Sequence, residues 1–174
     1  IGVTGVQTCA LPISGDEIAW YDNLGGGSFG PQQVIAPPLA DRAESVYATD
    51  LDGDGDADVL SASSGNDRIA WYENLGGGSF GPQQVITTSA DAATSVYATD
   101  LDGDGDADVL SASSGDDKIA WYENLGNGSF GPQQVITTSA AFALSVYATD
   151  LDGDGDADVL SASAFDDKIA WYEN

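Results

Sequence analysis

Histidine and methionine are absent from this 174-residue chain, cysteine occurs once, and only four residues are Lys or Arg. Without His, the chain lacks the commonest general base and the ligand of His-containing zinc sites. The four cationic side chains face 29 Asp and Glu, and the formal net charge of −25 argues against nucleic acid or an anionic membrane as a partner. No run of 18 apolar residues is present, so we expect no membrane insertion.

The acidic residues are concentrated in a nine-residue segment, Asp-Leu-Asp-Gly-Asp-Gly-Asp-Ala-Asp, which occurs at 50–58, 100–108 and 150–158. Carboxylates at positions 1, 3, 5 and 9 suit a loop that curls around a cation, and Gly at position 6 permits the sharp turn. Position 7 offers its backbone carbonyl as a further oxygen. Five carboxylates in nine residues repel one another at neutral pH, and a bound divalent cation offsets that repulsion.

The pattern therefore predicts three Ca²⁺ sites with oxygen ligands only. A solvated acidic turn is the alternative, but it does not explain why the same spacing occurs three times. An EF-hand is excluded, because position 12 of its loop is a bidentate Glu and here it is Ser61, Ser111 or Ser161. The candidate metal ligands are Asp50, Asp52, Asp54, Asp56, Asp58, Asp100, Asp102, Asp104, Asp106, Asp108, Asp150, Asp152, Asp154, Asp156 and Asp158.

The chain from residue 15 onward repeats with a period of 50 residues. Its β-branched and aromatic runs, bounded by Gly-rich and polar turns, predict four short strands in each unit. In the first complete unit the predicted strands are 45–49, 57–63, 69–74 and 80–86. Pro82 cannot donate a ladder hydrogen bond, which places the fourth strand at a sheet edge. The units are a partial one at 15–43, repeats at 44–93 and 94–143, and a partial repeat at 144–174.

Four strands joined by turns in each unit are typical of a propeller blade. The third strand is apolar or aromatic on both faces, through Ile69 and Trp71 on one and Ala70 and Tyr72 on the other. Such a strand must be covered from both sides. We therefore expect the Trp-Tyr pairs of the repeats, at 20–21, 71–72, 121–122 and 171–172, to pack between blades. The predicted fold is all-β, a β-propeller fragment of 13 strands in about three four-stranded antiparallel blades. Closed propellers have four to eight blades, so we expect an open arc.

Residues 1–14 do not fit the repeat. The stretch Val-Thr-Gly-Val-Gln-Thr-Cys-Ala-Leu-Pro-Ile at 3–13 resembles the in-frame translation of a sequencing adapter, and we interpret 1–14 as a non-native segment. It lacks the basic start and continuous apolar core of a signal peptide. Excluding it removes Cys9, the single thiol, and leaves the native N-terminus and the length of the parent protein open.

The acidic segment, together with Ile-Ala-Trp-Tyr-Glu-Asn at 69–74 and Ser-Phe-Gly-Pro-Gln-Gln-Val-Ile at 79–86, resembles the FG-GAP and VCBS repeat families. These are the calcium-binding blades also found in the head of integrin α chains. The resemblance implies a propeller with a calcium site between the first and second strands of each blade, on the rim. Near-identical repeats of this kind are similar to those of bacterial secreted and surface proteins, which implies an extracellular location. The chain departs from these families in having fewer blades than a closed ring.

These patterns favour a calcium-binding module in adhesion or ligand binding, with a protein or glycan as partner. One alternative is a carbohydrate-binding propeller, either a lectin or an accessory module of a polysaccharide-degrading enzyme. The other is a catalytic propeller such as a polysaccharide lyase. Most carboxylates recur at identical repeat positions, as structural ligands do, so we expect this segment not to be an enzyme. Because an open arc leaves apolar faces uncovered at its ends, we also expect self-association.

Overall fold

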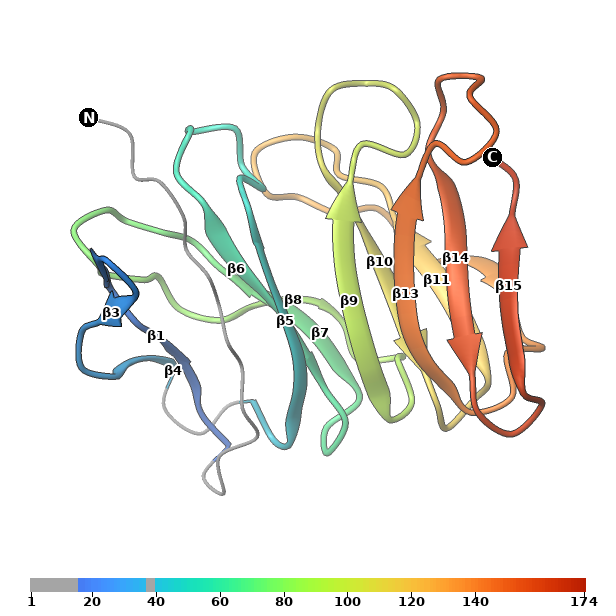
Figure 1. The fold of residues 1–174 in the computed structure, drawn as a ribbon, viewed down its shortest axis with the longest axis horizontal. Coiled ribbons are helices and arrows are strands. Elements are labelled where there is room, and N and C mark those ends of the chain that lie inside the picture. Colours follow the sequence, from blue (N-terminus) through green and yellow to red (C-terminus); the bar gives the residue numbers. More distant parts are fainter. Residues whose placement is uncertain (1–15, 37–39) are drawn as a thin grey trace.

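The chain forms a row of antiparallel β-sheets that stack face to face in the order of the sequence repeats (Figure 1). The structure is a computed structural model that describes residues 16–36 and 40–174. Residues 1–14, interpreted above as non-native, lie outside the described residues. The first complete sheet contains β5 (Ala43–Thr49), β6 (Asp58–Ser63), β7 (Arg68–Tyr72) and β8 (Gln84–Thr87). The second contains β9 (Ala93–Thr99), β10 (Asp108–Ser113), β11 (Lys118–Tyr122) and β12 (Gln134–Thr137).

The two ends of the row are smaller sheets. At the C-terminal end, β13 (Ala143–Thr149), β14 (Asp158–Ser163) and β15 (Lys168–Tyr172) form a three-stranded sheet. Near the N-terminus, β1 (Ile18–Trp20) pairs with β4 (Gln33–Ala36), and β2 (Asn23–Gly25) pairs with β3 (Ser28–Phe29). The described residues contain no helix, so none of them forms a helix long and apolar enough to cross a membrane. The all-β prediction is confirmed.

Two details differ from the sequence prediction. The described residues contain 15 strands rather than 13, because the first glycine-rich turn forms the additional hairpin of β2 and β3. The fourth strand of the first complete sheet begins at Gln84, not at residue 80. Phe80 makes an isolated bridge to Asn74, and Pro82, which lies between Phe80 and Gln84, has no N–H with which to continue the ladder.

The hydrophobic core lies between successive sheets. Ile69 and Trp71 of β7 pack with Ala93 and Val96 of the next sheet, and both are almost fully buried, at 0% and 3% exposure. Tyr72, on the opposite face of β7, packs against Ile18 of the preceding sheet. The central strand is thus covered on both faces, as its apolar pattern predicted. Each buried Ile or aromatic side chain contributes about 1.5–3 kcal/mol relative to exposure.

The row is open at its C-terminal end. Ile169 and Trp171 of β15 occupy the positions of Ile69 and Trp71, yet they are 84% and 50% exposed. Phe165, in the turn before β15, is also exposed. In Figure 1 the sheet of β13 to β15 and the pair of β1 and β4 lie at opposite ends of the row. The predicted open arc is confirmed, and it presents an apolar face.

Candidate metal sites

Each acidic loop joins the first two strands of a sheet, and all three loops lie along one edge of the row, at the top in Figure 1. The loop between β5 and β6 reverses direction through Gly53 and Gly55, whose φ angles are 82° and 93°. These left-handed values favour glycine at both positions. The equivalents of Gly55 in the other loops, Gly105 and Gly155, have φ angles of 100° and 108°. The predicted role of Gly at position 6 is therefore met in each repeat.

Backbone hydrogen bonds orient the carboxylates at the start of each loop. The two oxygens of Asp50 accept from the N–H groups of Gly53, at 2.8 Å, and Gly55, at 2.9 Å. Asp52 Oδ1 accepts from the N–H of Asp54 at 3.2 Å. The same bonds recur from Asp100, Asp102, Asp150 and Asp152. The loop is thus curled around its first carboxylate.

The last aspartate of each loop is buried at the start of the second strand. Asp58 accepts from the N–H of Leu51 at 2.9 Å and from the N–H of Asn74 at 2.8 Å, one bond to each oxygen. Burial is the largest influence on this group and raises the pKa of Asp58 to about 6, with further increases from the charges of Asp52 and Asp54. The two backbone N–H groups act in the opposite direction.

The pKa values of the other two closing aspartates are shifted in opposite directions. Burial also raises the pKa of Asp108 above its ordinary value. In the last repeat the hydrogen bond from the N–H of Leu151 is the largest influence, and it holds the pKa of Asp158 below its ordinary value. Since the sequences of the loops are identical, the difference comes from what surrounds each loop.

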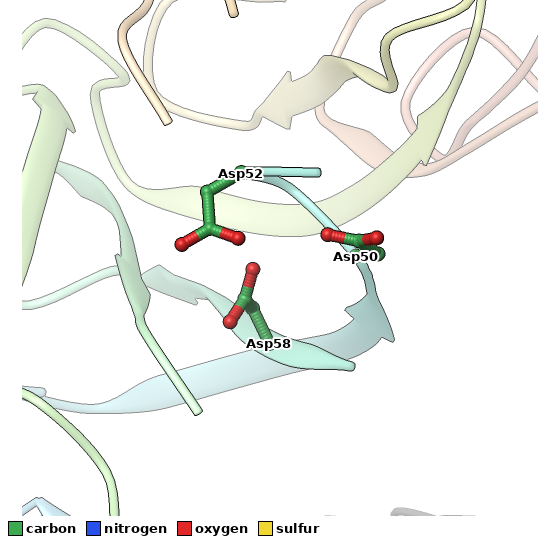
Figure 2. A group of neighbouring side chains, drawn as sticks. All are labelled: Asp50, Asp52 and Asp58. Carbon is green, nitrogen blue, oxygen red and sulfur yellow. The ribbon is translucent and has the colours of Figure 1, made fainter. Parts of the chain in front are cut away.

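Three carboxylates converge in every loop. Asp50, Asp52 and Asp58 can each offer an oxygen within 4.8 Å of the others. Figure 2 shows the carboxylates of Asp52 and Asp58 facing each other, with Asp50 beside them. The same grouping is formed by Asp100, Asp102 and Asp108, and by Asp150, Asp152 and Asp158.

The remaining predicted ligands lie outside these groups. Asp54 Oδ1 accepts from the N–H of Asp56 at 2.8 Å, and Asp104 and Asp154 make the same bond. Asp56, Asp106 and Asp156 were predicted to contribute their backbone carbonyl oxygens. The grouping of carboxylates does not test that prediction. A set of three converging carboxylates fits a hard cation such as Ca²⁺, which takes six to eight oxygens and accepts bidentate carboxylates.

A row of tyrosines beside the loops was not anticipated from the sequence. Tyr47, Tyr97 and Tyr147 lie on the first strands of successive sheets, with ring centroids 4.8 Å and 4.6 Å apart. A cavity of about 460 Å³ between the first two loops is lined by residues that include Tyr47, Tyr97, Asp50 and Asp100. Burial and the neighbouring tyrosines raise the pKa of Tyr97. The signal was a Tyr three residues before every acidic loop.

The stacked four-stranded sheets and their acidic edge loops define the class of this molecule: it is a propeller-type β-repeat protein. The chain belongs to the FG-GAP-like repeat family, whose family model matches residues 9–61, 50–111 and 100–161. The resemblance to FG-GAP repeats seen in the sequence is therefore confirmed. No curated protein matches the chain in sequence.

One similar solved structure comes from a study of the specific recognition of non-reducing terminal N-acetylglucosamine by an Agrocybe aegerita lectin. The two chains are 23% identical and superpose with a TM-score of 0.58. The match covers 84% of this chain and 41% of the lectin chain, so this chain spans less than half of the lectin's length. At this identity the likeness shows the shared fold alone.

Proposed function

We propose that this chain is a calcium-binding repeat module of a secreted or cell-surface protein and acts in adhesion or ligand binding. The observation that carries the proposal is the convergence of three carboxylates in every loop, at the same edge of three successive sheets. Membership of the FG-GAP-like repeat family supports it. In this proposal the segment is a binding module rather than an enzyme.

Calcium would act by holding the loops in one conformation. Asp50, Asp52 and Asp58 lie close together, and their charges repel one another when no cation is present. A bound cation converts this repulsion into attraction and fixes the hairpin formed by β5 and β6. Ca²⁺ suits the site better than Mg²⁺, because Mg²⁺ demands near-ideal octahedral geometry. Extracellular modules bind Ca²⁺ with Kd values of about 0.1–1 mM, which matches the proposed location.

Titration calorimetry of the full chain with Ca²⁺ and with Mg²⁺ tests this proposal. We expect three calcium ions per chain, each of them lost when the position-3 aspartate of its loop is changed by Asp52→Asn, Asp102→Asn or Asp152→Asn. Asp67→Asn is the matched control, since Asp67 is also acidic but lies in the turn between β6 and β7. The absence of heat with millimolar Ca²⁺ would refute the proposal.

A second candidate function is carbohydrate binding, favoured by the cavity between the first two loops. It combines tyrosine rings, which can cover the apolar face of a sugar, with carboxylates, which can accept hydrogen bonds from hydroxyl groups. The similar structure is that of a lectin that recognises N-acetylglucosamine. Titration with N-acetylglucosamine in the presence of calcium is the direct test. Binding that is lost in Tyr97→Ala supports carbohydrate binding. If the chain binds neither N-acetylglucosamine nor any sugar of a glycan array, carbohydrate binding is refuted.

A further inference from the structure

An asparagine after the third strand of each complete sheet contacts the closing aspartate of its own loop. The backbone N–H of Asn74 donates to Asp58 Oδ1 at 2.8 Å, and that of Asn124 donates to Asp108 Oδ1 at 2.7 Å. In the last repeat the N–H of Asn174 donates to Asp158 Oδ1 at 3.1 Å. The backbone of this asparagine thus supports a candidate metal ligand in all three repeats.

Two of these asparagines also reach into the preceding repeat. Asn124 Nδ2 donates to the carbonyl oxygen of Leu51 at 2.9 Å, across 73 residues of sequence. Asn174 Nδ2 makes the equivalent bond to Leu101 at 2.6 Å. Leu51 is the second residue of the first acidic loop, and Asn124 is 1% exposed, so the first of these bonds is shielded from water.

The bond from Asn124 ends on the peptide group that joins Leu51 to Asp52, a member of the first carboxylate group. The N–H of the same leucine donates to Asp58, the closing aspartate of that group. Asn124 therefore connects the first group with Asp108 of the second through side-chain and backbone hydrogen bonds. Asn174 connects the second group with Asp158 of the third in the same way.

We infer that Asn124 and Asn174 are positioning residues that couple consecutive calcium sites, so that filling one site tightens binding at the next. This inference rests on the proposed calcium binding. Calcium at the first site would fix Asp52 and Asp58 and hold the Leu51 carbonyl where Asn124 donates to it. The held asparagine would in turn keep its N–H directed at Asp108. Coupling of this kind is reciprocal, so the second site tightens the first by the same factor.

Asn74 provides an internal control with the same local structure. Its amide donates to the carbonyl of Ala57 at 2.9 Å, within its own repeat, as the amide of Asn124 also does to Ala107 at 3.1 Å. No acidic loop precedes Asn74 among the described residues, so it has no earlier site to contact. Replacing Asn74 or Asn124 with Ala removes comparable bonds within a repeat, and only the second change removes a bond between repeats.

Calcium calorimetry of the full chain carrying Asp152→Asn, which disables the third site, tests the coupling. The Kd of the second site is measured twice, once with the first site intact and once with the first site disabled by Asp52→Asn. The coupling is the second of these Kd values divided by the first. We expect a ratio of about 5 or more, the lower end of common allosteric coupling. Adding Asn124→Ala should bring the ratio below about 2, whereas adding Asn74→Ala should leave it unchanged.

A ratio of 1 in the Asp152→Asn protein, or a ratio that Asn124→Ala leaves unchanged, would overturn the inference while leaving calcium binding in place. Absence of calcium heat in the unsubstituted chain would instead overturn the proposed function. Asn174→Ala, at the end of the chain, gives a second measurement if Asn124→Ala fails to fold. In a chain with the first site disabled by Asp52→Asn and the third site intact, Asn174→Ala should abolish coupling between the second and third sites. Persistence of that coupling would also refute the inference.

Discussion

Ile69 and Ile169 occupy the same position in two repeats with the same local sequence, Ile-Ala-Trp-Tyr-Glu-Asn. Ile69 is fully buried between two sheets, whereas Ile169 is 84% exposed on the free face of the last sheet. Ile→Ala at a buried position costs about 2–5 kcal/mol, because apolar contacts are lost and a cavity remains. We therefore expect Ile69→Ala to lower the free energy of unfolding by about 2–5 kcal/mol. Ile169→Ala should change it by less than about 0.5 kcal/mol.

Urea unfolding followed by circular dichroism measures both values, at saturating calcium and at a protein concentration where light scattering shows a monomer. Ile119→Ala, at the equivalent buried position of the second complete sheet, is the matched control and should resemble Ile69→Ala. An equal loss of stability for Ile69→Ala and Ile169→Ala in the monomer would refute the open-row account, because it would require the last face to be covered.

Three further expectations follow from the same structure. Raising the protein concentration should promote association through the exposed face of β15, and Ile169→Asp should suppress it in sedimentation experiments. Because the pKa of Asp58 is about 6 in the folded chain, above the ordinary 3.8, folding without metal favours the protonated group. The stability that this group contributes without metal is therefore present in acid and lost as pH rises from about 4 to 6. Calcium binds the ionised form of Asp58, so calorimetry should show binding at the first site about tenfold weaker at pH 5 than at pH 7. Asp108→Asn, which changes the second site, should leave this pH dependence of the first site in place. A Cβ at Gly65 would lie 2.5 Å from Asp41 Oδ1, an exposed side-chain atom that can move aside, so Gly65→Phe should cost only about 0.5 kcal/mol in thermal unfolding. Adding Asp41→Ala should recover most of that loss, since the last repeat combines Ala141 with Phe165, which stacks on Phe142 at 4.3 Å.

The repeat period, the strand positions and the acidic loops could be predicted from the sequence because each depends on local pattern. Runs with β-branched and aromatic residues, bounded by turns, predicted the strands, including the one found as β6, and the glycine at position 55 marked a turn that the structure forms with positive φ. The convergence of Asp50, Asp52 and Asp58 follows from the same short-range spacing. The ends of the edge strands were less predictable, because Pro82 delays the ladder until Gln84.

The apolar pattern predicted that both faces of the third strand are covered, but the individual contacts between repeats could not be predicted from local pattern. Asn74, Asn124 and Asn174 are identical in local sequence, but the last two reach a preceding acidic loop. The ring contacts among Tyr47, Tyr97 and Tyr147 likewise depend on how sheets stack, over separations of 50 residues. Local pattern places a side chain on a strand, but the neighbouring sheet decides what it contacts and whether it is buried, as Ile69 and Ile169 illustrate.

Thermal unfolding of the full chain in calcium and in chelator measures directly whether calcium stabilises the repeats. At ten times its Kd, each site contributes about 1.4 kcal/mol if the unfolded chain does not bind the ion. Three sites together contribute about 4 kcal/mol, a large part of the roughly 5–15 kcal/mol of net stability of a folded domain. Replacing Asp52, Asp102 and Asp152 together with Ala should reproduce the effect of the chelator. We predict a melting temperature that is clearly higher in calcium than in chelator. The same melting temperature in both conditions would contradict calcium-dependent stability.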